Sequence, residues 1–274
     1  IKNKNIYTFN NKILNITKIL NNYIESKNDS KLTDFFYNLN AKVLINFKKT
    51  YLNDISYLNN LNGTIIFDKN ELTNLLLNSN FSDDKLLNFS ISKNKNDEKI
   101  TTFYSAHAKP FVEKYKFIKG FKGGELNLYS VTKNQKTKSK LNIINFKLNE
   151  VPALTKILTL ASLQGIADLL TGEGIRFNEL EMDFINDKKI IIIEELYAIG
   201  PSISILMDGY IEKNKLVSLR GTLVPATTLN KVIASIPIFG EILVGKKTGE
   251  GIFGVSFKIK GEPKNLKTFV NPVK

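Results

Sequence analysis

The sequence contains no cysteine and only one histidine, His107, among its 274 residues. Without cysteine the chain has no disulfide and no thiolate metal site, and one histidine excludes any site that needs several imidazoles. The lack of cysteine fits an oxidising compartment. No nucleophile or acid stands near His107 at a recognisable spacing, which favours a structural or exposed histidine over a catalytic one.

A long uncharged hydrophobic run is also missing. A membrane-spanning helix needs about 20 apolar residues. The longest weakly charged stretch, Val151 to Leu170, is interrupted by Lys156 and Asp168, and charges are costly inside a bilayer. We therefore expect a surface helix near residues 152–171 rather than a membrane span. Because the sequence begins at Ile1 without a methionine, we also expect that an N-terminal signal peptide or anchor is absent from it.

Acidic residues are scarce relative to basic ones. The chain has 39 lysines and arginines against 26 acids, which gives a formal charge of +13. This excess favours contact with anionic surfaces such as nucleic acid or phospholipid headgroups. The lysines are spread along the chain, however, and are not clustered with interleaved aromatic residues as in a nucleic-acid-binding face. The sequence therefore predicts no specific nucleic-acid partner.

Apolar residues alternate with polar ones along most of the chain, and 42% of the residues are hydrophobic. This period of two is the pattern of strands with one apolar face. The predicted strands contain Val43 to Phe47, Leu87 to Ile91, Leu126 to Leu128, Leu141 to Leu148, Leu180 to Phe184, Ile190 to Ile193, Ile203 to Met207, Val217 to Leu223 and Phe253 to Ile259. Most connections are too short for parallel crossovers, so we predict an antiparallel meander.

Few segments have helical spacing. We expect a helix that begins at Pro152 within residues 152–171, a second, short helix near 227–235, and helical spacing from Ile13 to Ile24. The chain is long enough for one large or two small domains. We divide it into an N-terminal β-rich part, residues 1–102, and a C-terminal β-sheet region, residues 103–274.

Gly240, Gly245 and Lys246 reproduce most of the spacing of a phosphate-binding loop. That loop must pass directly into a helix whose amides bind the phosphate. Here Lys247 replaces the Ser or Thr that would hold magnesium, and the following segment alternates as a strand up to Ile259. The sequence therefore favours a hydrophobic loop before a strand over a nucleotide site.

Three acids, Glu179, Glu181 and Asp183, share one face of a predicted strand. Such a group could serve a cation, but its strict alternation with Leu180 and Phe184 favours a solvated strand face. Nothing in the sequence assembles an active site. We therefore expect a protein that is not an enzyme, with no cofactor and no bound metal.

Several long stretches resemble a known family. They are Leu158 to Phe184, ELYAIGPSISILMDGYIE, GTLVPATTLNKVIASIPIFGEILVG and FKIKGEPKNLKTFVNP, with weaker similarity in FYSAHAKPFVEKYKFIKGFKGGELNLYS and NKILNITKIL. Together they resemble the C-terminal region of the AsmA-like family of Gram-negative envelope proteins, which includes the YhdP and TamB relatives. The resemblance extends from about Phe103 to Pro272, and the chain departs from it in the Asn and Lys at surface positions.

The resemblance implies a mainly β fold: an elongated, curved antiparallel β-sheet, groove-like, with a few short amphipathic α-helices. It implies a periplasmic protein attached to the inner membrane through an N-terminal anchor absent from this fragment. Such a protein offers a hydrophobic β-groove for phospholipid movement between the inner and outer membranes, in support of outer-membrane biogenesis. The implied partners are phospholipid acyl chains, the membrane surface and other envelope proteins.

From this resemblance we predict which residues line the groove and which form its end. Its predicted lining is Leu180, Met182, Phe184, Ile191, Ile193, Ile203, Ile205, Met207, Val217, Leu219, Leu223, Phe253, Val255 and Phe257. Its predicted end, or a membrane contact, is formed by Leu158, Leu169, Leu170, Ile236, Ile238, Phe239, Ile242 and Leu243.

Periodicity alone also allows a different arrangement. The same strands can close as a sandwich or barrel whose interior is filled by its own side chains. The core residues would then be Ile203, Ile205, Met207, Val217, Leu219 and Leu223. The protein would be a structural or assembly scaffold of the cell envelope that holds partners through exposed strand edges.

Overall fold

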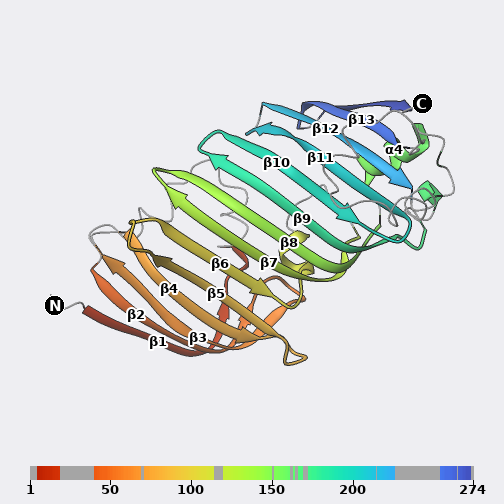
Figure 1. Cartoon of the computed structure of the whole chain (residues 1–274). Helices are drawn as coiled ribbons and strands as arrows, with labels where there is room; N and C mark the ends of the chain where they lie inside the picture. The colour runs from red at the N-terminus through yellow and green to blue at the C-terminus, as the bar shows by residue number, and fades with distance from the viewer. Residues whose placement is uncertain are drawn as a thin grey trace. The chain divides into compact units, whose positions relative to one another are not determined.

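The structure of the chain is a computed structural model. It describes residues 5–18, 40–68, 71–113, 120–149, 151–160, 163, 166–168, 172–213, 215–225, 254–263 and 265–272. Strands dominate the described residues, and they form one open sheet in which strand order follows chain order from β1 to β14 (Figure 1). The prediction of a mainly β fold built on an open sheet is confirmed.

Each strand predicted from alternation overlaps a strand of the structure, whereas five further strands, Asn5–Asn15, Tyr57–Asp68, Glu71–Asn80, Lys99–Ser105 and Asn265–Pro272, were not predicted. The elements are β1 (Asn5–Asn15), β2 (Ala41–Tyr51), β3 (Tyr57–Asp68), β4 (Glu71–Asn80), β5 (Leu86–Lys93), β6 (Lys99–Ser105), α3 (Lys109–Val112), β7 (Lys122–Lys133), β8 (Lys136–Leu148), α4 (Pro152–Leu160), β9 (Ile175–Asp187), β10 (Ile190–Ile199), β11 (Ile203–Glu212), β12 (Leu216–Pro225), β13 (Val255–Glu262) and β14 (Asn265–Pro272).

The sheet departs from an antiparallel meander at its first strand. β1 pairs with β2 in parallel, with Tyr7 opposite Val43 and Ile13 opposite Lys49. A parallel pair needs a crossover of a dozen or more residues, and the sequence from Ile16 to Asn40 is long enough to supply it. The expectation of helix from Ile13 is wrong for Ile13 to Asn15, because pairing with β2 overrides the local helical spacing.

The chain divides into two compact units. Unit 1 comprises residues 1–115 and 125–134, and unit 2 comprises residues 116–124 and 135–274. Unit 1 therefore contains β1 to β6, α3 and most of β7, whereas unit 2 contains β8 to β14 and α4.

Unit 1 has a hydrophobic cluster of Leu52, Leu58, Phe81 and Leu87, against which Ile16, Phe103 and Phe111 pack. The short helix α3 contributes Phe111, whose ring lies edge-on to Phe103 with centroids 4.8 Å apart. Phe103 also meets the ring of Phe89 on the neighbouring strand at 5.8 Å. Aromatic pairs of this geometry add to the burial energy, so α3 is fixed onto the strands of this unit.

Unit 2 contains a stack of three aromatic rings. Phe146 lies between Phe121 and Phe177, with centroid distances of 5.4 and 5.3 Å and nearly parallel planes. All three side chains are buried. Their stacking ties the segment before β7 to the β8–β9 pair.

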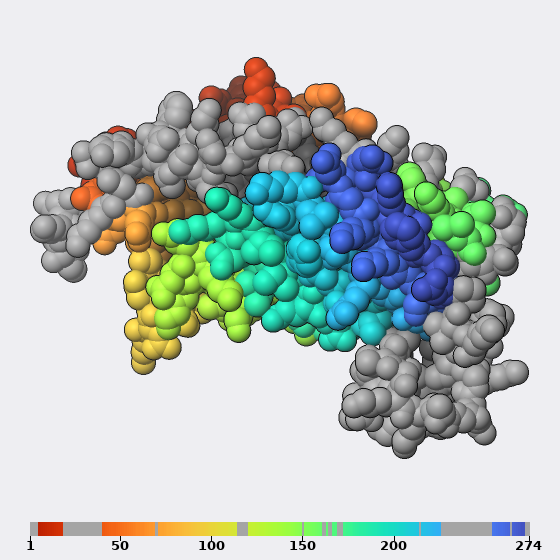
Figure 2. Space-filling model, turned by 90° about the horizontal axis from the view of Figure 1, so that it is seen from above, coloured from red at the N-terminus to blue at the C-terminus, as the bar shows by residue number. Residues whose placement is uncertain are grey.

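The helix expected near 152–171 is present over Pro152–Leu160 as α4, and Ile166 to Asp168 are again helical. Proline at the first helical position loses no hydrogen bond there. α4 contacts β14, and Figure 2 shows it beside the C-terminal strands of the unit. The second expected helix, 227–235, lies outside the described residues.

Candidate functional site

The predicted groove residues of unit 2 lie on one face of the sheet. Residues paired across an antiparallel ladder project to the same side. The pairing runs from Leu180 to Ala198, Ile205, Leu223 and Val255 across five consecutive strands. The apolar face of unit 2, as we define it, carries Leu180, Met182, Phe184, Ile191, Ile193, Ile203, Ile205, Met207, Val217, Leu219, Leu223, Val255 and Phe257. Phe253, the remaining predicted residue, lies outside the described residues.

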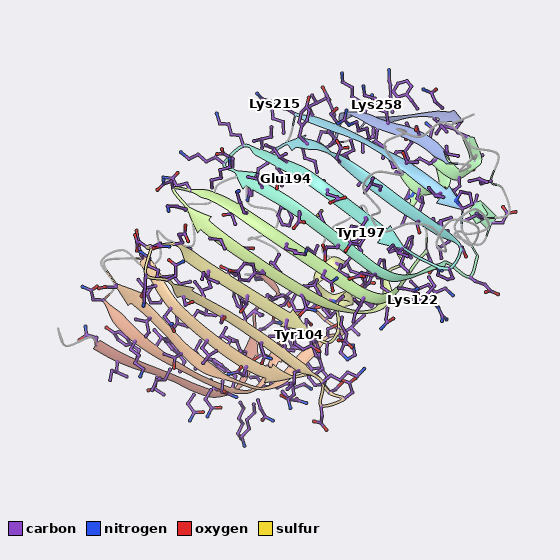
Figure 3. The ribbon with its side chains drawn as sticks, in the orientation of Figure 1. Tyr104, Lys122, Glu194, Tyr197, Lys215 and Lys258 are labelled. Carbon is purple, nitrogen blue, oxygen red and sulfur yellow. The ribbon has the colours of Figure 1, made fainter. Side chains whose placement is uncertain are left out.

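A β-bulge in β10 keeps this face continuous. Ile193 and Leu196 are three residues apart, so regular alternation would place them on opposite faces. Instead Ile193 pairs with Phe184 and Leu196 with Met182, and the register shift between them leaves Glu194 as the extra residue (Figure 3). A bulge of this kind inserts one unpaired residue into a strand. The bulge therefore returns Leu196 to the apolar face.

Sequence reasoning missed several members of the apolar face. They are Leu141 and Ile143 of β8, Leu196 and Ala198 of β10, Ile211 of β11, Ile259 of β13 and Val270 of β14. The signal for β10 was present, because two adjacent glutamates interrupt the alternation just before Leu196.

Burial varies across the apolar face. Ile203 and Leu223 have no exposed surface and Val255 is 1% exposed. The side chains along the middle of β9, β11 and β12 are only half-buried; they are Leu180, Met182, Phe184, Ile205, Met207 and Leu219. Phe257 covers Gly221, because a Cβ added there would lie 2.6 Å from its ring. The face thus combines a packed end with a half-buried middle.

The opposite face of unit 2, which we call its polar face, carries charged and polar side chains along the middle of β8 and β9, with buried Phe177 and Ile185 towards the ends of β9. Lys140 forms an ion pair with Glu181, and the amide of Asn142 donates to Glu179 at 2.6 Å. This arrangement agrees with a solvated strand face for these acids, and among the described residues no group of His, Cys, Asp and Glu is placed to hold a metal ion. Burial, together with the charges of Glu181 and Glu179, raises the pKa of Tyr197 on this face to about 12 (Figure 3). The hydrogen bond to Glu181 raises the pKa of Lys140 above its usual value.

Unit 1 has an apolar face of its own. Its ladders align Val43, Ile65, Leu75 and Ile91 across β2 to β5, and Leu87, Phe89 and Phe103 continue it through β5 and β6. On the edge strand β1, the side chains of Tyr7 and Phe9 share this face and are 45% and 54% exposed. Each unit therefore presents a sheet face on which apolar side chains are aligned.

The residues predicted for the groove end are less informative. Leu158 is fully buried within α4, which leaves it no surface for membrane contact in this conformation. Leu169, Leu170, Ile236, Ile238, Phe239, Ile242 and Leu243 lie outside the described residues, as do Gly240, Gly245 and Lys246. Within the described ranges, the helices are too short or too polar to cross a bilayer.

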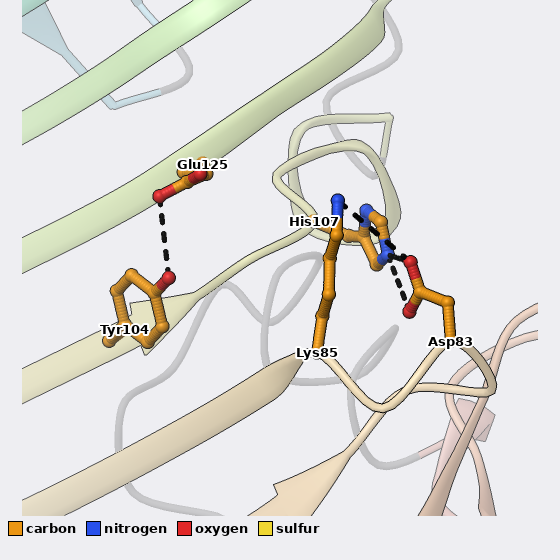
Figure 4. Close-up of polar contacts among 5 residues, drawn as sticks. All are labelled: Asp83, Lys85, Tyr104, His107 and Glu125. Carbon is orange, nitrogen blue, oxygen red and sulfur yellow. Dashed lines mark hydrogen bonds and ion pairs between the residues drawn. The ribbon is translucent and has the colours of Figure 1, made fainter.

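His107 has an acidic neighbour that its sequence context did not reveal. Its Nε2 lies 2.9 and 3.0 Å from the two carboxylate oxygens of Asp83, which is 24 residues away (Figure 4). The hydrogen bond to His107 lowers the pKa of Asp83. The imidazole also lies edge-on to Phe81, and the hydroxyl of Ser105 donates to the backbone carbonyl of His107 rather than to its ring. The contacts are those of a structural pair at the β4–β5 turn.

Comparison with known proteins adds no identification. No protein-family model, curated protein or solved structure matches the chain.

Proposed function

We propose that this chain is a non-enzymatic, periplasmic lipid-transport module that shields phospholipid acyl chains against the apolar faces of its sheet. The observation that carries the proposal is the register of unit 2, which gathers apolar side chains from six consecutive strands, β8 to β13, on one face. In its middle these side chains are half-buried rather than packed away.

Burial supplies the binding energy in this proposal. Covering apolar surface is worth roughly 25 cal/mol per Å², and it needs no residue of special chemistry. Acyl chains are flexible and uniform along their length, so a face of Ile, Leu, Met and Phe accepts them in many positions. This suits movement of a lipid along the sheet better than fixation at one point.

The resemblance to AsmA-like envelope proteins agrees with this proposal and adds its setting. It supports a place between the inner and outer membranes, a role in outer-membrane biogenesis, and attachment to the inner membrane through an N-terminal anchor.

A scaffold of the cell envelope is the second candidate. The observation that favours it is the edge strand β1, where Ile6, Phe9 and Ile13 are 65%, 54% and 60% exposed. Exposed strand edges recruit other chains by strand addition. A self-filled, closed core is no longer part of this candidate, because the sheet is open.

The test is lipid extraction from the purified chain. We expect phospholipid in the organic extract of the wild type, and a loss of most of it in the Ile205→Asp and Leu219→Asp variants, because a charge on the apolar face opposes acyl-chain burial. Thin-layer chromatography and mass spectrometry measure the lipid, and circular dichroism checks that each variant is folded.

Leu206→Asp is the matched control. Leu206 is adjacent to Ile205 on β11, is similarly half-buried, and pairs with Thr222 on the opposite face. This variant should keep its lipid. A folded wild-type chain that never carries lipid, or equal lipid loss from Leu206→Asp and Ile205→Asp, would reject acyl-chain binding on the apolar face and favour the scaffold.

A further inference from the structure

Charge is unevenly distributed over the polar face of unit 2. Two basic side chains of unit 2 have acidic partners on neighbouring strands: Lys140 of β8 pairs with Glu181 of β9, and Arg220 of β12 pairs with Asp208 of β11 at 2.8 Å. On β13 and β14 three lysines stand against one acid, Glu262. Lys258, Lys260 and Lys267 are exposed there, and no ion pair or hydrogen bond engages them among the described residues.

The register brings these lysines together. Lys260 pairs directly with Lys267 across β13 and β14, and Lys258 lies two residues before Lys260 on the same face. Arg220 pairs with Lys258 from the β12 side. We call Lys258, which is labelled in Figure 3, together with Lys260, Lys267 and Phe269 the basic edge patch. Like charges directly opposite each other in a sheet are destabilising, so an anionic partner would relieve a cost already present.

An aromatic side chain completes the patch. Phe269 pairs with Lys258 on the polar face and is 54% exposed, although polar residues surround it. On the other face of the same edge strand, Leu266 is 41% exposed. Exposed phenylalanine and leucine beside lysines are the combination with which proteins rest on a bilayer, the rings entering the headgroup region and the ammonium groups meeting anionic lipid.

We infer that the basic edge patch docks unit 2 onto the surface of an anionic phospholipid bilayer. The positive charge of the patch is complementary to anionic lipid headgroups. The exposed ring of Phe269 favours a bilayer over a partner that binds by charge alone. This inference rests on the proposed function, to which it adds the place where lipid enters. The edge strand β14 that would touch the membrane also borders the apolar face, because its Val270 pairs with Phe257. Lipid could then pass from the bilayer to the sheet without crossing water.

The experiment is vesicle flotation with the full chain. We use vesicles of phosphatidylcholine alone and vesicles of equal parts phosphatidylcholine and phosphatidylglycerol. Wild type should float with the anionic vesicles only. The triple variant Lys258→Gln/Lys260→Gln/Lys267→Gln should partition roughly 100-fold more weakly at low salt, since each basic residue contributes about fivefold.

Two further variants make the result specific. Lys122→Gln/Lys136→Gln/Lys138→Gln removes the same charge from exposed positions elsewhere in unit 2 and should float like wild type. Phe269→Ser keeps the charge and should weaken binding about equally at low and high salt, because salt screens only the electrostatic part.

Equal loss from both triple variants would overturn the inference in favour of nonspecific charge attraction. Flotation of Phe269→Ser like wild type, with equally tight binding to single-stranded nucleic acid, would overturn it in favour of a polyanion partner. Lipid extraction from the Lys258→Gln/Lys260→Gln/Lys267→Gln variant separates the two proposals. If docking fails while lipid remains bound, only the docking inference falls; if wild type docks but never carries lipid, the proposed function falls.

Discussion

At the scale of single residues, the hydrogen bond between Asp83 and His107 depends on the fold and not on proximity in the sequence. Asp83 lies in the turn between β4 and β5, and His107 follows β6. β5 and β6 form an antiparallel pair, which brings the end of β6 back beside this turn. Sequence reasoning found no acid near His107, because the two residues are 24 positions apart and only strand pairing joins them.

We predict that Asp83→Asn lowers the thermal stability of the chain slightly at neutral pH. The pKa of Asp83 is lowered in the folded state, so its ionised form contributes stability above the ordinary carboxyl value of 3.8. That contribution is lost as the pH falls through the folded pKa. Melting curves followed by circular dichroism from pH 7 to pH 3 should therefore show a gap between wild type and variant that closes in acid.

Asp84→Asn is the control for this prediction. Asp84 is the next residue in the same turn and has a φ of 61°, a conformation that Asn adopts as readily as Asp. It should melt like wild type across the range. A gap between wild type and Asp83→Asn that persists unchanged at pH 3 would contradict an electrostatic role for Asp83.

At the scale of one strand, β10 shows how a bulge maintains an apolar face. Four consecutive isoleucines precede Glu194 and Glu195, and the apolar pattern resumes at Leu196. Strict alternation of side chains across this stretch would place Leu196 on the polar face. The register shift returns Leu196 to the apolar face, since Ile193 pairs with Phe184 and Glu195 pairs with the next residue, Asp183.

We predict that deleting Glu194 is tolerated. The shortened strand alternates regularly and leaves Ile193, Leu196 and Ala198 on the apolar face. The expected change in the free energy of unfolding is about 1 kcal/mol or less, typical of a substitution that leaves the core intact. Urea denaturation followed by tyrosine fluorescence measures it.

Deletion of Leu206 from β11 is the matched comparison. No bulge lies at that position, so the deletion moves either Ile203 and Ile205 or the residues after them to the polar face. Exposing the fully buried Ile203 alone costs roughly 1.5 to 3 kcal/mol. If loss of Glu194 proved as damaging as loss of Leu206, the bulge would be required for the fold itself.

For the whole molecule, the decisive property is that the sheet is open, with β1 and β14 at its two edges. Each edge strand has a row of backbone groups with no strand partner in the described residues. Exposed apolar side chains accompany both rows, with Phe9 on β1 and Phe269 on β14 each 54% exposed. Open edges and a half-buried apolar face are liabilities in a simple globular domain, and the lipid binding that we propose would make use of both.

We predict that amide hydrogen exchange reflects this architecture. Amides of β1 should exchange at least tenfold faster than those of β3 in the same unit, and amides of β14 faster than those of β11, because edge amides open locally without unfolding the unit. Mass spectrometry of peptic fragments measures the rates. Protection of β1 or β14 equal to that of the central strands would show that another segment or a second chain covers that edge.

The sequence by itself determined the class of fold and most of its elements. Alternation at period two identified nine strands between Val43 and Ile259 but not β3, β4 or β6, and the position of Pro152 identified the start of α4. It also identified many residues of the apolar face of unit 2, because alternation within a strand fixes which residues share a side. The envelope setting and lipid role stay predictions.

Only the tertiary structure decided how those strands combine. It made β1 parallel to β2, placed Leu196 through the bulge at Glu194, and set Lys260 against Lys267. The parallel direction of β1 and the pairing of Lys260 with Lys267 depend on inter-strand hydrogen bonds that alternation within one strand does not specify. Alternation indicates which residues share one side of a strand. The pairing partner, direction and register of each strand depend on the free energy of the whole sheet.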